Sequence, residues 1–311
     1  MAMRRVRRRV DGVLLLDKPA GITSNGALQA AKRLFDADKA GHTGTLDPFA
    51  TGLLPLCFGE ATKFAQSLLD AQKSYIATVY FGVRTTTGDI DGDVVATTPC
   101  VLDRETVEAM LPRFRGRIAQ LPPMHSALKR DGRPLYEYAR KGIELERAAR
   151  EVDIERLDLL TWQPPLATLE VTCSKGTYIR VLAEDIGAAL VCGAHLAALR
   201  RTATGGFGVD GAISLDRLAD IPADARDALL LPVESLLAAM PALDIDAAAA
   251  AALRQGREVG VPGIAAGRYR CRDPQRVLIG VVEVEDGVLR GARLCRTGEP
   301  AGAQDAVTPR D

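Results

Sequence analysis

The sequence lacks the features that mark most metal-binding, disulfide-rich and membrane-spanning proteins. Its 311 residues contain six cysteines, three histidines and no C-x-x-C pair, so zinc-site spacing and a disulfide framework are both absent. We therefore expect no metal site, and six buried, reduced thiols. The longest stretch without a charged residue, residues 186–199, is 14 residues long, whereas a helix needs about 20 to cross a bilayer. The N-terminus carries five arginines but no apolar segment behind them, which predicts a cytoplasmic protein without a secretory signal.

Several common catalytic signatures are missing as well. The chain has no G-x-x-x-x-G-K-[ST], no H-E-x-x-H and no G-x-S-x-G, which argues against P-loop NTPases, zinc metalloproteases and α/β-hydrolases. Forty basic and forty acidic residues cancel, so the total charge does not indicate a nucleic-acid binder. Residues 111–150, however, hold ten Lys/Arg against four Asp/Glu, and residues 210–250 hold two against eight. This asymmetry fits a basic surface that faces a polyanion, although scattered solvated charges would produce it too.

The order of the predicted elements favours an α+β protein of two domains. A chain this long exceeds the ~100–200 residues usual for one domain. Residues 74–83 alternate as a strand does, residues 178–190 fit a helix, and residues 133–142 fit a short helix. Because strands and helices do not follow a repeated βαβ order, a mixed, largely antiparallel sheet with flanking helices is favoured over a doubly wound sheet. We place a domain boundary near residue 240, before a small β-rich part in which Asp286-Gly287 predicts a hairpin turn.

One segment, residues 41–59, could carry chemistry. Its single carboxylate is Asp47, which precedes Pro48 and is therefore biased toward an extended backbone. Apolar surroundings would raise the pKa of this carboxyl group unless a cation lay nearby, and an arginine would keep it ionised as a nucleophile requires. An Asp-Pro pair more often only begins a turn. The spacing alone does not decide between these two interpretations.

Segment 41–53, Gly-His-Thr-Gly-Thr-Leu-Asp-Pro-Phe-Ala-Thr-Gly-Leu, closely resembles a motif of the TruB family, the bacterial tRNA pseudouridine synthases that act at position 55. Further blocks resemble the family in the same order, at residues 17–24, 122–129, 135–140, 174–180 and 199–201. The resemblance covers about residues 12–215, and His125 departs from it by replacing a tyrosine found in many members.

The resemblance implies a domain plan. Residues 1–11 would be a disordered basic tail outside the family pattern, and residues 12–240 a catalytic domain with an RNA-gripping insertion at about 121–150. Residues 241–311 would be a small PUA-like, β-rich RNA-binding domain, to which the resemblance is looser.

The resemblance also implies roles for particular residues. Asp47 would be the catalytic nucleophile, and Arg180 would pair with its carboxylate to keep it charged and directed. Tyr75 would stack against the target uracil and take part in proton transfer. The remaining implied contacts are with the nucleotide, from His42, Tyr178 and Leu199, and with the RNA backbone, from Lys63, Lys129 and Arg140.

The implied substrate is the T stem-loop of tRNA. The reaction cuts the N1–C1′ bond, turns the detached base and joins C5 to C1′, so it needs no cofactor; a monomer without an obligate protein partner is expected. Two alternatives remain. One is a guide-RNA-dependent pseudouridine synthase, against which the basic segment 111–150 argues, because a stand-alone enzyme needs its own grip on the RNA. The other is a tRNA-binding or tRNA-folding protein in which catalysis is secondary.

Overall fold

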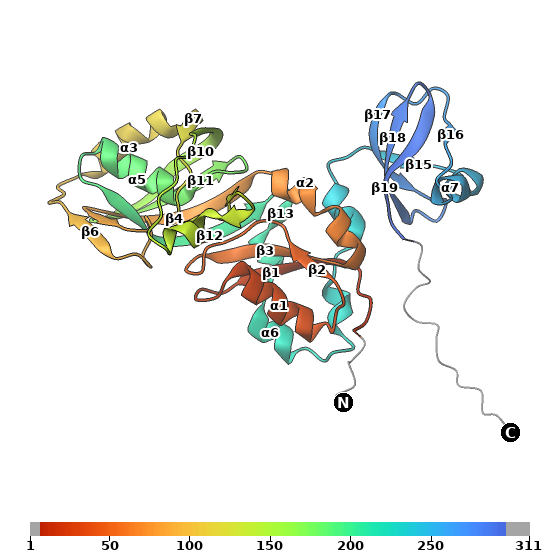
Figure 1. The fold of residues 1–311 in the computed structure, drawn as a ribbon, viewed down its shortest axis with the longest axis horizontal. Coiled ribbons are helices and arrows are strands. Elements are labelled where there is room, and N and C mark those ends of the chain that lie inside the picture. The colour runs from red at the N-terminus through yellow and green to blue at the C-terminus, as the bar shows by residue number, and fades with distance from the viewer. Residues whose placement is uncertain (1–6, 297–311) are drawn as a thin grey trace.

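Two sheets organise the protein, whose computed structural model describes residues 7–296 (Figure 1). The larger sheet has ten strands. Eight of them form its main path, in the order β14 (Ile213–Ser214), β1 (Gly12–Lys18), β3 (Thr51–Phe58), β12 (Ala194–Thr204), β4 (Lys73–Phe81), β11 (Leu166–Cys173), β10 (Arg150–Gln163) and β7 (Gly116–Gln120). Two short strands lie off this path, β2 (Ala40–His42) beside β3 and β13 (Phe207–Gly208) beside β12. Only the β1–β14 and β3–β12 pairings of this sheet are parallel. The α+β class predicted from the irregular order of elements is therefore confirmed.

Helices cover the two halves of this sheet separately. In the first half, α1 (Ser24–Leu34) packs Ala27, Leu28 and Ala31 against apolar side chains of β1 and β3. Its N-cap is Thr23, whose hydroxyl accepts a hydrogen bond from the Gly26 N–H at 2.9 Å. In the second half, α5 (Ile179–Ala189) packs against β4 and β12. Both helices thus bury their apolar faces on the sheet. The seam, where the two halves of the sheet join, is formed by strands.

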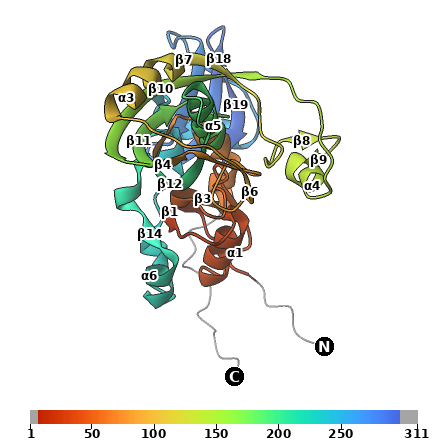
Figure 2. The same cartoon turned by 90° about the vertical axis from the view of Figure 1, so that its left-hand side faces the viewer.

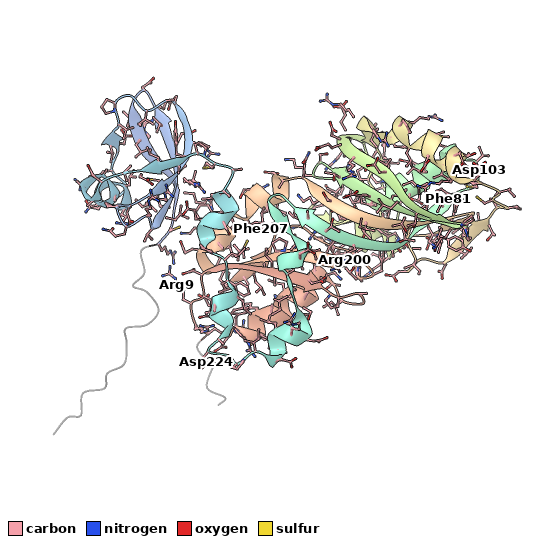
Figure 3. The ribbon with its side chains drawn as sticks, turned by 180° about the vertical axis from the view of Figure 1, so that it is seen from behind. Arg9, Phe81, Asp103, Arg200, Phe207 and Asp224 are labelled. Atoms are coloured by element: carbon pink, nitrogen blue, oxygen red, sulfur yellow. The ribbon has the colours of Figure 1, made fainter. Side chains whose placement is uncertain are left out.

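The seam is formed by β12, which runs parallel to β3 on one side and antiparallel to β4 on the other. Gly52 pairs with Arg201 at this point and has φ +100°, and a Cβ atom there would lie only 2.3 Å from the Arg201 carbonyl oxygen. Only glycine fits such an approach. Beside it, the Arg200 guanidinium pairs with the Asp17 carboxylate of β1 at 2.7 Å, near the middle of the molecule (Figure 3). The seam therefore fixes β3, and the loop that leads into it, relative to the second half.

Between β7 and β10 the chain forms an excursion, residues 121–149, that projects from the body (Figure 2). It contains the hairpin of β8 (Lys129–Arg130) and β9 (Arg133–Pro134), followed by α4 (Leu135–Ala139). The helix is shorter than the predicted residues 133–142, because Arg133 and Pro134 form β9 and pair with β8 instead. Gly142, at φ +69°, lies past its end.

The smaller sheet has the order β15 (Ala242–Asp244), β17 (Gly267–Arg272), β18 (Leu278–Glu285), β19 (Val288–Leu294) and β16 (Val259–Gly260), with α7 (Ala247–Arg254) beside it. Asp286 and Gly287 turn the β18–β19 hairpin with φ +51° and +72°, as expected of a type I′ turn. Val281 of β18 packs into an apolar cluster with β1 and β3. Lys63 adds a polar contact, because its Nζ donates to the Leu294 carbonyl at 2.9 Å.

The remaining elements connect these layers. They are α2 (Ala65–Asp70), α3 (Arg104–Met110), α6 (Leu215–Asp220), the hairpin of β5 (Val83–Thr85) and β6 (Val94–Thr97), and the 3₁₀ turns η1 (Gly59–Lys63), η2 (Leu111–Phe114), η3 (Val209–Gly211), η4 (Arg226–Leu229) and η5 (Val233–Leu237). The helices described between residues 7 and 296 include none long and apolar enough to cross a membrane. All six cysteines are free thiols, and four are buried while Cys100 and Cys295 are half-buried.

Part of the predicted basic tail lies outside the described residues, namely residues 1–6. Arg8, by contrast, is held by the body: its Nε donates to the Phe35 carbonyl at 2.8 Å, and its two terminal nitrogens bind the Asp227 carboxylate. Val10 is buried. We expected residues 1–11 to be disordered. From Arg8 onward, however, the chain is held in place by these contacts.

Val191, directly after α5, is a strained position. It is 85% exposed and has φ +57°, a conformation that costs a β-branched residue about 1–2 kcal/mol. We expect Val191→Gly to raise the free energy of unfolding by about 1 kcal/mol, because glycine adopts this helix-ending conformation without strain. Chemical denaturation measures the change. Val101, 99% exposed and without a positive φ, gives the control Val101→Gly, for which no gain is expected; a loss of stability in Val191→Gly would contradict the argument.

Candidate active site

A buried lysine, Lys18, anchors the loop that carries Asp47. Lys18 Nζ donates to the carbonyl oxygens of Pro19 at 2.8 Å, Ile22 at 2.7 Å and Pro48 at 3.2 Å, so one ammonium group joins the end of β1 to the Asp47 loop. Burial lowers the pKa of Lys18 to about 8. On the preceding side of Asp47, the Leu46 N–H donates to Ser24 Oγ at 2.8 Å. The carboxylate is therefore presented on a backbone that is held on both sides.

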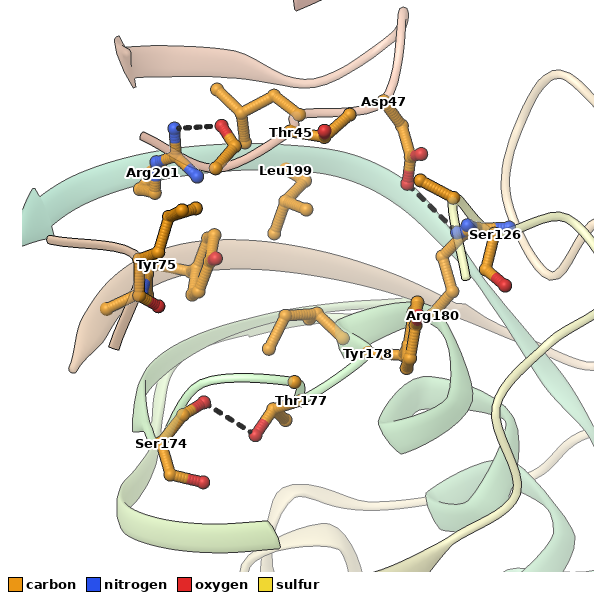
Figure 4. Close-up of a pocket in the computed structure, with 17 residues that line it drawn as sticks. Thr45, Asp47, Tyr75, Ser126, Ser174, Thr177, Tyr178, Arg180, Leu199 and Arg201 are labelled. Carbon is orange, nitrogen blue, oxygen red and sulfur yellow. Dashed lines mark hydrogen bonds and ion pairs between the residues drawn. The ribbon is translucent and has the colours of Figure 1, made fainter. Parts of the chain in front are cut away.

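Arg180 reaches Asp47 from the other half of the protein. It lies in the first turn of α5, and its Nε is 3.0 Å from Asp47 Oδ2 and 3.5 Å from Asp89 Oδ2. Its terminal nitrogens donate to the backbone carbonyls of Thr87 at 2.9 Å and His125 at 2.7 Å. Only 5% of the side chain is exposed. Four partners thus fix the guanidinium, and Figure 4 shows it directed at Asp47.

The charge balance at Asp47 has opposing contributions. Burial raises the pKa of its carboxyl group most, and the like charge of Asp89 adds to the rise. The ion pair and hydrogen bond with Arg180, and the charge of Lys18, lower it. The net direction is upward, so the carboxylate is less well solvated than an ordinary surface aspartate. An anion of this kind is a better nucleophile than a hydrated one.

A cavity of about 280 Å³ opens beside this pair (Figure 4). Tyr75 of β4 and Leu199 of β12 form one wall, both nearly buried, and Tyr178 at the start of α5 forms another. Burial raises the pKa of Tyr75 and of Tyr178, so both phenols are neutral at pH 7. The cavity is of a size and character to hold one flat ring against aromatic and aliphatic side chains.

A second cavity, of about 610 Å³, continues from the first toward the excursion. His42, His125 and Arg140 line it. Arg140 also lies over the ring of Tyr136, 5.3 Å from its centroid. Burial lowers the pKa of His42 and of His125. All predicted site residues except Lys63 and Lys129 thus line these two adjoining cavities.

The other two predicted backbone contacts lie outside the two cavities. Lys129 is exposed on the β8–β9 hairpin of the excursion. Lys63 forms an ion pair with Glu60 at 2.7 Å and holds the end of β19, as described above. Among residues 7–296, no group of three or more His, Cys, Asp or Glu side chains is placed to hold a metal ion.

Sequence reasoning missed three polar residues of the site. Asp89 enters from the β5–β6 hairpin as a second partner of Arg180. Gln120, at the end of β7, holds the Tyr178 backbone from both sides: its Oε1 accepts from the N–H at 3.0 Å, and its Nε2 donates to the carbonyl at 3.3 Å. Arg201 is fully buried and donates to Leu53 and Gly44 carbonyls at 2.6 and 3.2 Å. Of these, only Arg201 had a signal in the sequence, as part of the 199–201 block.

Comparison with family profiles covers most of the chain. Residues 32–179 match the N-terminal domain of TruB family pseudouridylate synthases. Residues 180–238 match the tRNA pseudouridylate synthase B C-terminal domain, and residues 241–295 match the C-terminal part of pseudouridine synthase II TruB.

Curated proteins named tRNA pseudouridine synthase B are similar to this chain over nearly its whole length. That of Azoarcus sp. (strain BH72) is 58% identical over 291 residues, covering 94% of this chain and 97% of the relative. That of Thiobacillus denitrificans (strain ATCC 25259 / T1) is 56% identical over 295 residues, covering 95% and 99%. Among solved structures, a chain in a Cbf5-Nop10-Gar1 complex has a TM-score of 0.69 at 30% identity, covering 88% of this chain and 78% of that one.

The raised pKa of Asp47 predicts that this residue costs stability. A carboxyl group whose pKa is higher in the folded than in the unfolded state favours folding when protonated, and that contribution is lost as the pH rises through the folded pKa. We therefore expect Asp47→Asn to raise the free energy of unfolding at pH 7, with a gain that shrinks as the pH falls toward the ordinary value of 3.8. Denaturant titrations between pH 4 and 8 measure it.

Asp103 provides a control, for which the opposite change in the free energy of unfolding is expected. It caps α3, and the hydrogen bond from Thr106 lowers the pKa of Asp103, so Asp103→Asn should cost stability at pH 7. A loss of stability in Asp47→Asn at pH 7 would show that Arg180 outweighs burial at this position.

Proposed function

The chain belongs to the TruB family of pseudouridylate synthases, and on that premise we propose that it isomerises the uridine at position 55 in the T-loop of tRNA. The observation that carries the proposal is the Asp47–Arg180 ion pair at 3.0 Å, at the mouth of a cavity that fits one base. As a pseudouridine synthase the protein is an isomerase, which moves the uracil from an N1 to a C5 attachment.

In the proposed reaction, the Asp47 carboxylate attacks C1′ as the N1–C1′ bond breaks. The detached uracil turns within the small cavity, C5 bonds to C1′ as the aspartate leaves, the proton on C5 departs and N1 gains one. Arg180 keeps the attacking group ionised and aimed, because its four partners leave it one orientation. Holding the free base close to C1′ is what makes rejoining faster than loss.

The aromatic side chains that line the small cavity are suited to retaining the detached uracil. Tyr75 would stack on the uracil, with Leu199 and Tyr178 closing the cavity around it. Because burial keeps the Tyr75 phenol neutral, its hydroxyl would donate hydrogen bonds or a proton at neutral pH. His42 lines the larger cavity, from which we propose that it holds the nucleotide out of its loop.

The surroundings suit an RNA stem-loop. The excursion, with exposed Lys129 and with Arg140 stacked on Tyr136, would grip the phosphates and bases outside the active site. We assign residues 12–240 to the catalytic domain and the sheet after residue 240 to a small PUA-like RNA-binding domain. We also propose that the protein acts in the cytoplasm as a monomer, without an obligate partner.

The decisive experiment is nucleotide-resolution mapping of pseudouridine in an unmodified tRNA transcript incubated with the purified chain alone. We expect modification at position 55 with the wild type and none with Asp47→Asn, while the affinity of that variant for tRNA stays within about threefold, because the change removes a charge and not a base contact. Product formation by Asp47→Asn would remove this residue from the mechanism.

The same experiment tests the alternatives. A chain of similar fold is solved in a Cbf5-Nop10-Gar1 complex, so a synthase that acts only with added partners is the second candidate, and a guide RNA is the partner to test. Modification that appears only after a guide RNA is added would favour it. Tight tRNA binding with no modification at any position would favour a tRNA-folding protein instead.

Phosphate contacts by the excursion predict a steep dependence of tRNA affinity on salt. The slope of log K against log [salt] reflects the number of neutralised phosphates, and each lost contact reduces it by about 1. We expect Lys129→Ala and Arg140→Ala each to flatten the slope by about that amount. Arg104→Ala is the matched control, because Arg104 is already paired with Glu108 on α3. Unchanged slopes in both variants would place the RNA elsewhere on the surface.

A further inference from the structure

The two cavities share part of their lining. The residues common to both are Thr45, Leu46, Asp47, Ser126, Ala127 and Arg180. In the proposed function, on which this inference rests, the small cavity holds the uracil and the larger one holds the backbone of the loop. The ribose joins base to backbone, so it must lie at this shared wall, where Asp47 reaches C1′.

Ser126 is the shared residue whose side-chain polar atom is buried without a hydrogen-bond partner in the described part of the chain. Its side chain lies on the excursion and is only 5% exposed, and its Oγ makes no hydrogen bond within the described part of the chain. The hydroxyl faces Tyr178, close enough to lower the pKa of that phenol against the larger rise from burial, yet outside hydrogen-bond geometry. A buried hydroxyl without a partner is costly to the fold, and a ligand that supplies a hydrogen-bond partner recovers that cost.

The backbone on both sides of Ser126 is held by hydrogen bonds, so the position of its Cβ at the shared wall is fixed. The Ser126 N–H donates to the Met124 carbonyl at 2.9 Å, and its carbonyl accepts from the Tyr136 N–H at 3.1 Å. The preceding residue, His125, receives the Arg180 hydrogen bond. Figure 4 shows Ser126 beside the Arg180 guanidinium, on the side of Asp47 and away from Tyr75.

We propose that Ser126 Oγ hydrogen-bonds the ribose 2′-hydroxyl of the target nucleotide. The 2′-hydroxyl is bonded to the carbon next to C1′, so it lies within reach of a group that flanks Asp47. The uracil, by contrast, would lie inside the small cavity, stacked on Tyr75 and against Leu199. Through this contact the excursion would supply part of the active site itself and let it distinguish a ribonucleotide from a deoxyribonucleotide.

A binding cycle tests the contact. Two T stem-loop RNAs are compared, with uridine or 2′-deoxyuridine at the target position, each against the Asp47→Asn chain and the Asp47→Asn/Ser126→Ala chain, so that no turnover intervenes. We expect the deoxy substitution to weaken binding to the first chain about fivefold, the value of one neutral hydrogen bond, and to change binding to the second less than twofold. Changes in sugar pucker affect both chains alike and cancel in the cycle.

Two further measurements separate this inference from the proposed function. Ser126→Ala in the otherwise wild-type chain should slow pseudouridine formation several-fold, whereas Ser235→Ala should not. Ser235 is the matched control, because its Oγ is also buried without a partner but lies in η5, outside both cavities. A wild-type chain that forms no pseudouridine overturns the proposed function, while an equal deoxy penalty in both chains, or none in either, overturns the Ser126 contact alone.

Discussion

The ion pair between Asp47 and Arg180 is the interaction on which the rest of the site depends. The two residues come from different halves of the large sheet, and β12 between them sets their distance by pairing with β3 and β4. Lys18 fixes the loop that carries Asp47, and the backbone carbonyls of Thr87 and His125 fix the Arg180 guanidinium. The Arg180 guanidinium is buried, and a buried charge without a partner would be costly, so the half-buried Asp47 carboxylate stabilises it while remaining open to the cavities.

The local signals of the sequence were sufficient where short-range physics decides the structure. Asp286-Gly287 turns its hairpin as predicted, and Thr23 and Asp103 cap their helices, because capping and turn chemistry involve only neighbouring residues. The helix after residue 133 came out shorter than predicted, since pairing of Arg133 and Pro134 with β8 took its first turn. Strand pairing at a distance is not visible in a local pattern.

The site was predicted only in part for the same reason. Asp47 stood out by its isolation in an apolar segment, but an Asp-Pro pair is more often only the start of a turn, and the partner Arg180 came from a family resemblance. Asp89 and Gln120 carry no motif. They matter because the fold brings one to Arg180 and the other to the Tyr178 backbone, and such convergence depends on the whole sheet. Lys18 could be a surface lysine by its sequence, whereas burial makes it an internal anchor.

The place of β12 in the chain has a consequence for synthesis. A ribosome that has released the Asp47 loop still has to make both α5 and the strand that fills the middle of the sheet. Until then the nascent polypeptide exposes the open edges of β3 and β4 and carries an acid without its counter-ion. The enzyme therefore cannot mature by adding finished segments one after another, and its chemistry starts only once a late strand has been inserted between two early ones.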